Sequence, residues 1–467
     1  MDDSESTPPP IQLKNDRAAG WWSWPVIVLS VITVGGSVFF ESSRDGKSGS
    51  DGASTSEVRG FKASDLALMK LEGQMVIAAS IADPKEARKS LEGVRDQVRG
   101  DGMVAAFLLL EDFVSRGKEW EDEGKPPSWN EEASSLRDLT ERAIASGVTA
   151  EERESLEEKL GWFSELAVDQ ETGEVPQGAS IRMHSMLVLA AVGVIFLGAV
   201  FSVLTGVTLL FLLLKKQRDG AQLLAFSKEG IPRGICLECF AIYLGTMAVG
   251  EIFVNRMPVG FSPVVYLLAV VLPLVWPLVR RVRWKEFLNS IGWHKGKGVL
   301  REVGAGFVGY TGVLAIASVG IFLTLVLVFV VTQIQSAGMT GEGKGADSSS
   351  VGPVTHPIVG WIYEGGLKER LLCLLLAAGF APLFEEIFFR GALHRYLRGA
   401  LKFFPAALIT SVIFAALHPQ GWMGIPALAA IGIGFSLLLE WRDSLIAPMV
   451  AHAINNGVLV GLFCLAL

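Results

Sequence analysis

Six polar residues near the end of the sequence lie within or at the ends of long apolar runs, where ionisable groups are costly and therefore indicate function. They are two acids, one guanidinium, two imidazoles and one amide: Glu385, Glu386, Arg390, His418, His452 and Asn456. A carboxylate with an imidazole can activate water. An imidazole and an amide together can donate hydrogen bonds to an oxyanion. The set therefore predicts hydrolysis of an amide bond.

Helical spacing separates the two acids. Glu386 and Arg390 are four residues apart, with the acid on the N-terminal side, which is the favourable order for an ion pair. Glu385 is turned about 100° away from Glu386 around the same helix. We therefore expect Arg390 to neutralise Glu386, while Glu385 is left without this partner and can act as the general base.

The following two apolar runs can reach Glu385. If the helix through Glu385 and the helix 403–418 pair antiparallel around Lys402, Glu385 and His418 both lie about 25 Å from that turn. His452 and Asn456, again four apart, share one face of the last helix. Asn455 competes for the role of the functional amide, and the spacing from His452 favours Asn456.

A metal site is the alternative that these residues leave open. Glu385, His418 and His452 offer one carboxylate and two imidazoles, which is a ligand set of catalytic zinc sites. The sequence therefore predicts either a glutamate-activated water with no certain cofactor, or a zinc-activated water at the same three residues.

These motifs resemble the CAAX-protease and bacteriocin-processing family of intramembrane proteases, which includes the type II CAAX prenyl endopeptidases. The pattern is Glu-Glu-x-x-x-Arg, then Phe-x-x-x-His from Phe414, then His-x-x-x-Asn, in that order across about residues 365–460. The resemblance implies Glu385 as catalytic glutamate and His418 as its partner on the water. It implies His452 and Asn456 as the oxyanion site, supported by Glu386 and Arg390. The family is often labelled metalloprotease.

Two departures from the family leave the substrate open. An acidic domain of about 140 residues follows the first apolar run, and a Gly/Ser-rich stretch at 340–352 precedes the motifs. The first hypothesis is an endopeptidase acting on a membrane-associated protein or peptide. The alternatives are a non-catalytic scaffold or bacteriocin self-immunity factor that binds a partner through the outer domain, and a proton-coupled transporter. The sequence lacks the internal repeats that are typical of transporters.

Composition places the chain in a membrane. Half of the 467 residues are hydrophobic and 19% are charged, and the apolar runs repeatedly reach spanning length. We expect an all-α, polytopic membrane helix bundle. It would have about nine spans: 21–40, 186–214, 234–254, 261–280, 304–334, 369–392, 403–418, 424–440 and 443–465. The basic residues flank these runs and form no single patch, so no nucleic-acid partner is expected.

Loop charges predict the orientation, because Lys and Arg are enriched in cytoplasmic loops. The basic positions that nine alternating spans place in the cytoplasm are Lys14, Arg17, Lys215, Lys216, Arg218, Arg280, Arg281, Arg283, Lys285, Arg395, Arg398 and Lys402. Residues 41–183 carry 30 acidic and 18 basic residues, a balance of −12, against −7 for the whole chain. This helical block is expected outside the cytoplasmic membrane of a bacterium.

The predicted organisation has five parts: a cytoplasmic tail at 1–20, a first span at 21–40, an acidic extracytoplasmic helical domain with a flexible linker at 41–183, spans 2–5 at 184–335, and a protease core at 336–467. Other polar residues receive plainer interpretations. The Cys236-x-x-Cys239 pair is expected to pack between helices. Glu238 and Glu251 either line a substrate path or face a neighbouring helix. Four histidines without partners at useful spacing are interpreted as interfacial or loop residues: His184, His294, His356 and His394.

Overall fold

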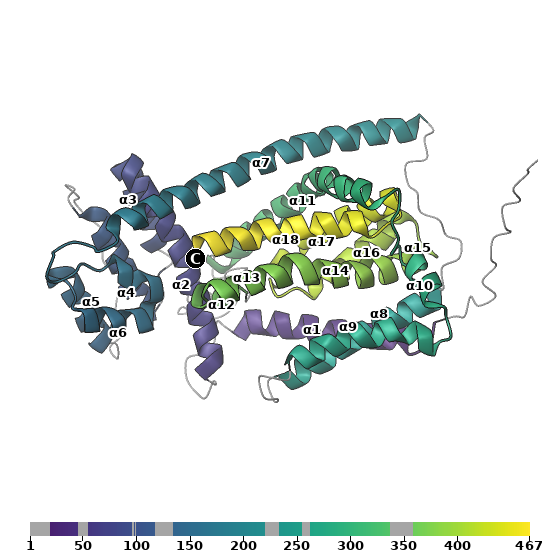
Figure 1. Cartoon of the computed structure of the whole chain (residues 1–467), viewed down its shortest axis with the longest axis horizontal. Coiled ribbons are helices and arrows are strands. Elements are labelled where there is room, and N and C mark those ends of the chain that lie inside the picture. The colour runs from purple at the N-terminus through teal and green to yellow at the C-terminus, as the bar shows by residue number, and fades with distance from the viewer. Residues whose placement is uncertain are drawn as a thin grey trace, which may run out of the picture. The chain divides into compact units, whose positions relative to one another are not determined.

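The computed structural model describes residues 19–44, 55–95, 98, 100–116, 134–219, 233–254, 262–336 and 358–467. Lys14, Arg17, His356 and the stretch 340–352 lie outside these residues, and so does most of the linker. Within the described ranges the fold is helical, and the only extended pairing is an isolated bridge between Val148 and Asp169. The expected all-α class is confirmed (Figure 1).

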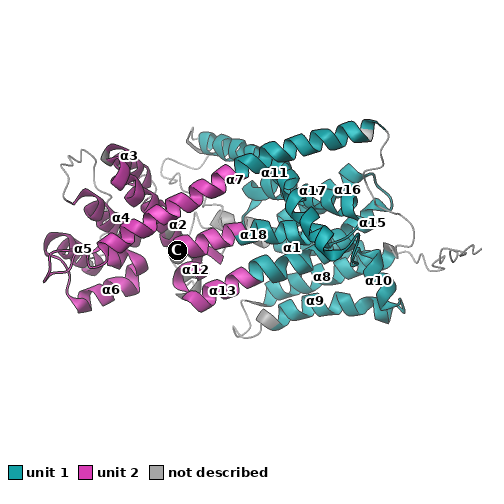
Figure 2. Ribbon diagram, turned by 45° about the horizontal axis from the view of Figure 1, so that its top comes forward, with its two compact units in different colours: residues 1–50, 199–354, 376–457 teal, residues 51–198, 355–375, 458–467 magenta. Residues whose placement is uncertain are grey.

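The chain divides into two compact units, which Figure 2 colours separately. The first contains residues 1–50, 199–354 and 376–457, and the second contains 51–198, 355–375 and 458–467. The predicted five-part organisation stays a prediction.

The first unit is a bundle of apolar helices. Its members before the motif region are α1 (Ser23–Arg44), the C-terminal half of α7 (Gly178–Arg218), α8 (Arg233–Val254), α9 (Ser262–Val279), α10 (Trp284–Ser290) and α11 (Val299–Ser336). Helix α8 packs on both α1 and α9. Two prolines, Pro273 and Pro277, lie inside α9. Beyond it the chain bends by 117° into α10, which carries charged residues.

The motif region forms the rest of this unit. Two π-helical segments, η3 (Leu376–Phe380) and η4 (Glu386–His394), flank the short α14 (Ala381–Glu385), and α15 (Arg395–Arg398) continues the same rod. Then follow α16 (Phe403–Ala416), the short η5 (Trp422–Gly424), α17 (Ile425–Arg442) and α18 (Ile446–Ala466). Helix α17 packs on α11 and α16. Asp443 ends α17 in the left-handed conformation, with φ of 54°, so α18 can turn back after three residues.

Among the described residues, six helices are long and apolar enough to cross a membrane, and the bent pair α9–α10 makes a seventh if it is counted as one span. Two shorter apolar helical stretches cover Ser23–Gly36, within α1, and Phe403–Ala416. The chain is a polytopic integral membrane protein. The expected count of nine spans is not confirmed by the described residues.

The second unit contains a separate helical core. It is built from α2 (Thr55–Ala82), α3 (Pro84–Arg95), α4 (Gly100–Ser115), α5 (Ser134–Ser146), α6 (Ala150–Leu160) and η1 (Gly161–Leu166), with α12 (Ile358–Glu364) and α13 (Leu367–Leu375). Phe107, Leu110 and Phe163 are buried at its centre. Thr149 begins α6 with a capping box that pairs it reciprocally with Glu152.

Candidate active site

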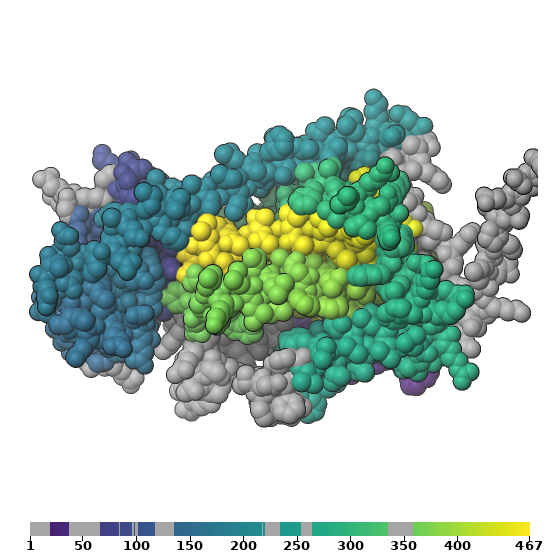
Figure 3. Space-filling model, viewed as in Figure 1, coloured from purple at the N-terminus to yellow at the C-terminus, as the bar shows by residue number. Residues whose placement is uncertain are grey.

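The two acids of the first motif lie at a change of helix type. Glu385 is the last residue of α14, and Glu386 is the first of the π-helix η4. A π-helix closes i→i+5 hydrogen bonds, is rare, and is frequently found at functional sites. Figure 3 shows α18 running directly against this segment, as the contacts of His452 and Asn456 require.

Glu386 is shared by two buried basic side chains. Its Oε1 lies 3.0 Å from Nη1 of Arg390 and 2.9 Å from Nδ1 of His452. The side chains of Glu386 and Arg390 are completely buried, and that of His452 is 3% exposed. The predicted pair between Glu386 and Arg390 is therefore present. Its bond to His452 was not predicted, and it leaves Nε2 as the free nitrogen of that imidazole.

Arg390 is held from four directions. Besides Glu386, its guanidinium donates to the carbonyl of Gly432 at 3.3 Å. It also lies over the rings of Phe414 and Phe435, at 4.6 and 5.2 Å from their centroids. A planar cation between two aromatic faces is favoured electrostatically. This packing fixes the guanidinium, and through it the carboxylate of Glu386.

Glu385 has a different environment. Its side chain is 23% exposed, and its Oε2 lies 3.7 Å from Nε2 of His452. That separation is too long for a direct hydrogen bond. Within the described residues this oxygen has no hydrogen-bond partner. Of the two neighbouring acids, Glu385 is thus the one whose side chain is partly exposed, although its Oε2 is itself buried.

His418 follows the C-terminal end of α16 in a turn. Its Nδ1 lies 2.7 Å from the carbonyl oxygen of Phe414. Because a carbonyl oxygen can only accept, Nδ1 carries the proton and Nε2 is free to accept. The ring of Phe414 stands 4.2 Å from His418 and 6.0 Å from His452, centroid to centroid. His418 is also close enough to interact electrostatically with Glu385 and His452.

Asn455 and Asn456 belong to one hydrogen-bonded chain. The hydroxyl of Tyr310 donates to Oδ1 of Asn455 at 3.2 Å, and the Asn455 amide donates to Oδ1 of Asn456 at 3.2 Å. The Asn456 amide in turn donates to the carbonyl of Ala377 at 2.9 Å. One N–H of Asn456 stays free of these bonds. The two asparagines are therefore coupled and not competing, and Tyr310 was not singled out from the sequence.

Comparison with known proteins finds a similarity in the segment that carries these residues. Residues 367–458 match the family model described as Rce1-like type II CAAX prenyl endopeptidase. This segment is similar to Rce1-like domains. A curated relative, the membrane-embedded CAAX protease MroQ of Staphylococcus aureus (strain USA300), is 34% identical over 85 residues. That stretch covers 17% of this chain and 34% of the relative, so the chain spans about a third of the relative's length. No solved structure matches.

Zinc remains the alternative at these residues. Among the residues that the structure describes, no three His, Cys, Asp or Glu side chains are placed to hold one metal ion. Nδ1 of His452 is bonded to Glu386, and Nδ1 of His418 is bonded to the Phe414 carbonyl, which leaves Nε2 of both imidazoles available. Metal-binding histidines commonly hold their second nitrogen in this way, so the zinc alternative stays a prediction.

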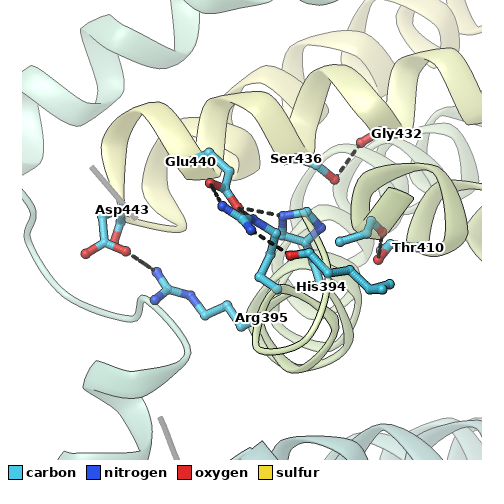
Figure 4. Close-up of polar contacts among 10 residues, drawn as sticks. His394, Arg395, Thr410, Gly432, Ser436, Glu440 and Asp443 are labelled. Carbon is cyan, nitrogen blue, oxygen red and sulfur yellow. Dashed lines mark hydrogen bonds and ion pairs between the residues drawn. The ribbon is translucent and has the colours of Figure 1, made fainter. Parts of the chain in front are cut away.

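His394 corrects the sequence interpretation. It was expected at an interface or in a loop, but it is completely buried at the end of η4, with Nε2 3.1 Å from Oε1 of Glu440 on α17 (Figure 4). Arg398 binds the same carboxylate. The signal was present, because Glu440 lies near the end of an apolar run and His394 lies four residues after Arg390.

Other polar residues also find partners in neighbouring helices. Glu238 accepts from the Trp276 indole at 2.7 Å and from the backbone N–H of Gly20 at 2.9 Å, and pairs with Arg280 at 3.0 Å. The second of the two expectations for Glu238, a neighbouring helix, therefore applies. Cys236 and Cys239 are free and buried in the bundle core, as expected for packing residues.

Proposed function

We propose that the chain is an intramembrane endopeptidase that hydrolyses a peptide bond of a membrane-associated protein or peptide. The observation that carries this proposal is the position of a partly exposed Glu385, whose Oε2 makes no hydrogen bond among the described residues, beside an imidazole whose other nitrogen is fixed by a buried acid. The arrangement follows the general logic of a reactive group, a neighbouring imidazole and a third group that orients the imidazole. The Rce1-like segment supports the same class of reaction.

In the proposed reaction, Glu385 takes a proton from a water molecule that also donates a hydrogen bond to Nε2 of His418. The water oxygen attacks the peptide carbonyl carbon. The carbon–nitrogen bond then breaks as the proton passes from Glu385 to the leaving nitrogen. The products are a carboxylic acid and an amine, and transfer of the remaining water proton from the acid to the amine gives a carboxylate and an ammonium, so atoms and charge balance without a further reactant.

In the same proposal, His452 and Asn456 stabilise the oxyanion. A doubly protonated His452 donates through Nδ1 to Glu386 and offers its Nε2–H to the developing charge. In that state the two negative charges of Glu385 and Glu386 equal the two positive charges of Arg390 and His452, so the four side chains together carry no net charge. Neutrality matters because an unbalanced charge away from water costs several kcal/mol. The free N–H of Asn456 supplies a second donor.

The test uses the full chain purified into nanodiscs with a quenched-fluorescence peptide library. We expect wild-type protein to cleave, and both Glu385→Ala and Glu385→Gln to lose about 10²- to 10⁴-fold in rate, the range for removal of a general base. Glu369→Gln, the same change at an exposed acid of α13, is the matched control and should keep full activity. Retained cleavage by Glu385→Ala would refute the assignment.

Two further arms separate the remaining hypotheses. The assay is repeated with a metal chelator, and the glutamate mechanism proposed here predicts an unchanged rate. Loss of cleavage with the chelator, restored by zinc, would favour the metal mechanism. Failure of the wild-type protein to cleave any library member, while it still binds membrane peptides, would favour the scaffold hypothesis.

We also propose that the protein resides in a bacterial cytoplasmic membrane, with the N-terminus inside and residues 41–183 outside. The basic segments around Arg280 and Arg395 support this orientation through the positive-inside rule. The outer helices would then recognise the substrate or hold it near the membrane.

A further inference from the structure

A second group of buried ionisable residues lies at the far end of the π-helix from Glu386. His394 and Glu440 are completely buried, and Arg398 is 11% exposed. Glu440 accepts from Nε2 of His394 at 3.1 Å and from Nη2 of Arg398 at 3.1 Å. Figure 4 shows the side chains of His394 and Glu440 meeting between η4 and α17. We call His394, Arg398 and Glu440 the distal cluster.

The distal cluster and the candidate active site are attached to the same two elements. Along η4, Glu386, Arg390 and His394 follow at intervals of four residues, and each contacts α17 or α18. On α17, the carbonyl of Gly432 accepts from Arg390, and Glu440 lies eight residues further on. The rod of η4 and α15 is therefore fastened to α17 at two levels, one beside the acids and one at the distal cluster.

The hydroxyl groups around this region do not form such a link. Thr410 donates to the carbonyl of Ala406, and Ser436 donates to the carbonyl of Gly432, each within its own helix (Figure 4). The distal cluster and Arg390 join η4–α15 to α17, and Arg395 of α15 adds an ion pair with Asp443, the residue that ends α17, at 2.6 Å. Thr410 is a suitable control position, since it is buried but makes no bond between helices.

A contribution to folding stability does not by itself explain why these three ionisable side chains are buried together. Burying an ion pair costs desolvation that its attraction barely repays, and the best-attested use of buried polar pairs is to fix register. A π-helix is also an uncommon backbone that its surroundings must hold in place. A one-residue shift of η4 would rotate Glu386 away from His452 and Glu385 away from the water site.

We propose that His394, Arg398 and Glu440 are positioning residues that hold the π-helix η4 in the register that points Glu385 and Glu386 at His452. This inference rests on the proposed function for its catalytic consequence. Its structural consequence, the register of η4, is independent of any substrate. The two consequences are therefore measured separately.

The kinetic arm compares His394→Phe, His394→Gln and Glu440→Gln in the peptide-cleavage assay, per folded molecule. His394→Phe removes the donor to Glu440, and we expect kcat to fall about ten-fold with KM changed less than two-fold. His394→Gln keeps a donor, and should recover most of the rate. The double variant His394→Phe/Glu440→Gln should be no slower than its slower single variant, because both break one unit. Thr410→Val should match the wild type.

The structural arm uses hydrogen–deuterium exchange of the full chain in nanodiscs. We expect His394→Phe to increase exchange across residues 386–394 by at least five-fold and Thr410→Val to leave it unchanged. This result would stand even if no variant, including the wild type, cleaved a peptide, a finding that would count against the proposed function only. Wild-type kcat in His394→Phe, or a lowered melting temperature with unchanged kcat and unchanged exchange in η4, would overturn the positioning role.

Discussion

Glu385 and Glu386 are identical residues that are adjacent in sequence, and their environments separate them. Glu386 is fully buried between Arg390 and His452, while Glu385 is partly exposed and reaches only the edge of His452. Acid–base sites commonly work through two such groups in contrasting surroundings. The same contrast makes the two acids distinguishable by mutation.

Replacing Glu386 should damage the site differently from replacing Glu385. Glu386→Gln keeps the shape but removes the charge that Arg390 and His452 share. We expect kcat to fall about 10²-fold, as for the loss of one oxyanion-stabilising group, because His452 is no longer oriented. Single-turnover cleavage measures the effect. Activity equal to the wild type would contradict the orienting role of Glu386.

A substitution of Tyr310 tests the role of the hydrogen bonds that run from Tyr310 through Asn455 to Asn456. Tyr310→Phe removes one hydroxyl, and with it the bond that fixes the Asn455 amide. A net hydrogen bond contributes about 1 kcal/mol, so a five- to ten-fold fall in kcat is expected. Combining Tyr310→Phe with Asn455→Ala should add little to either change. Fully additive losses would show that Tyr310 acts by another route.

The pair between Glu386 and Arg390 was predicted from the sequence, because residues four apart in one helix lie on the same face. The bond between Glu386 and His452 was not predicted. It depends on how α18 is rotated about its own axis relative to η4, and the spacing of residues within α18 does not determine that rotation. His394 was misinterpreted for a related reason. Its partner Glu440 is 46 residues away, and spacing carries no information about that contact.

The helix through the two acids is the element that the sequence described least well. The apolar run 369–392 predicted one continuous span, and it contains α13, η3, α14 and η4 in succession. Hydrophobic periodicity does not distinguish a π-turn from an α-turn, because one extra residue in a turn leaves an apolar run unchanged. The apolar composition predicted that this run is helical and long enough to span a membrane. It did not predict the change between α-helix and π-helix within the run.

Gly432 lies at a close approach between α17 and the elements around it. A Cβ at this position would lie 2.8 Å from the side chain of Ser411 and 3.2 Å from Nη2 of Arg390. We expect Gly432→Ala to displace the Arg390 guanidinium and reduce kcat at least ten-fold while the protein still inserts into membranes. Gly461→Ala on α18, where a Cβ meets nothing within 4 Å, is the control. Equal activity of the two variants would argue against this close contact.

For the molecule as a whole, the proposed orientation gives a labelling prediction. Glu158 in α6 and Lys285 in α10 are both exposed. On intact cells a membrane-impermeant maleimide should label Glu158→Cys, and should label Lys285→Cys only after permeabilisation. The unsubstituted protein gives the background of the four native cysteines. The reverse pattern would invert the proposed topology.

The second unit should respond to pH through Lys70. Burial, followed by the nearby positive charge of Arg370, lowers the pKa of Lys70 from 10.5 to about 8. Between pH 8 and 10.5 the unfolded chain therefore binds more protons at this residue than the folded chain does, so stability rises with pH across that window. Below pH 8 Lys70 is protonated in both the folded and the unfolded chain, so the free energy of unfolding is lowered by the full cost of burying the ammonium.

Thermal unfolding of the full chain measures this effect. We expect Lys70→Met to raise the melting temperature at pH 7.5 and to flatten the rise between pH 8 and 10.5 relative to the wild type. Lys159→Met, at an exposed position of α6, is the matched control. Parallel pH curves for wild type and Lys70→Met would exclude this titration.

The four contacts that hold Arg390 limit the amino acids that can replace it. A lysine ammonium is a compact point charge, and it could not reach the Glu386 carboxylate and the Gly432 carbonyl together while filling the slot between Phe414 and Phe435. Arg390→Lys would therefore keep the positive charge but lose part of the contacts that fix the carboxylate of Glu386 beside His452. A substitution that conserves charge at this position is thus among those that the site can least tolerate.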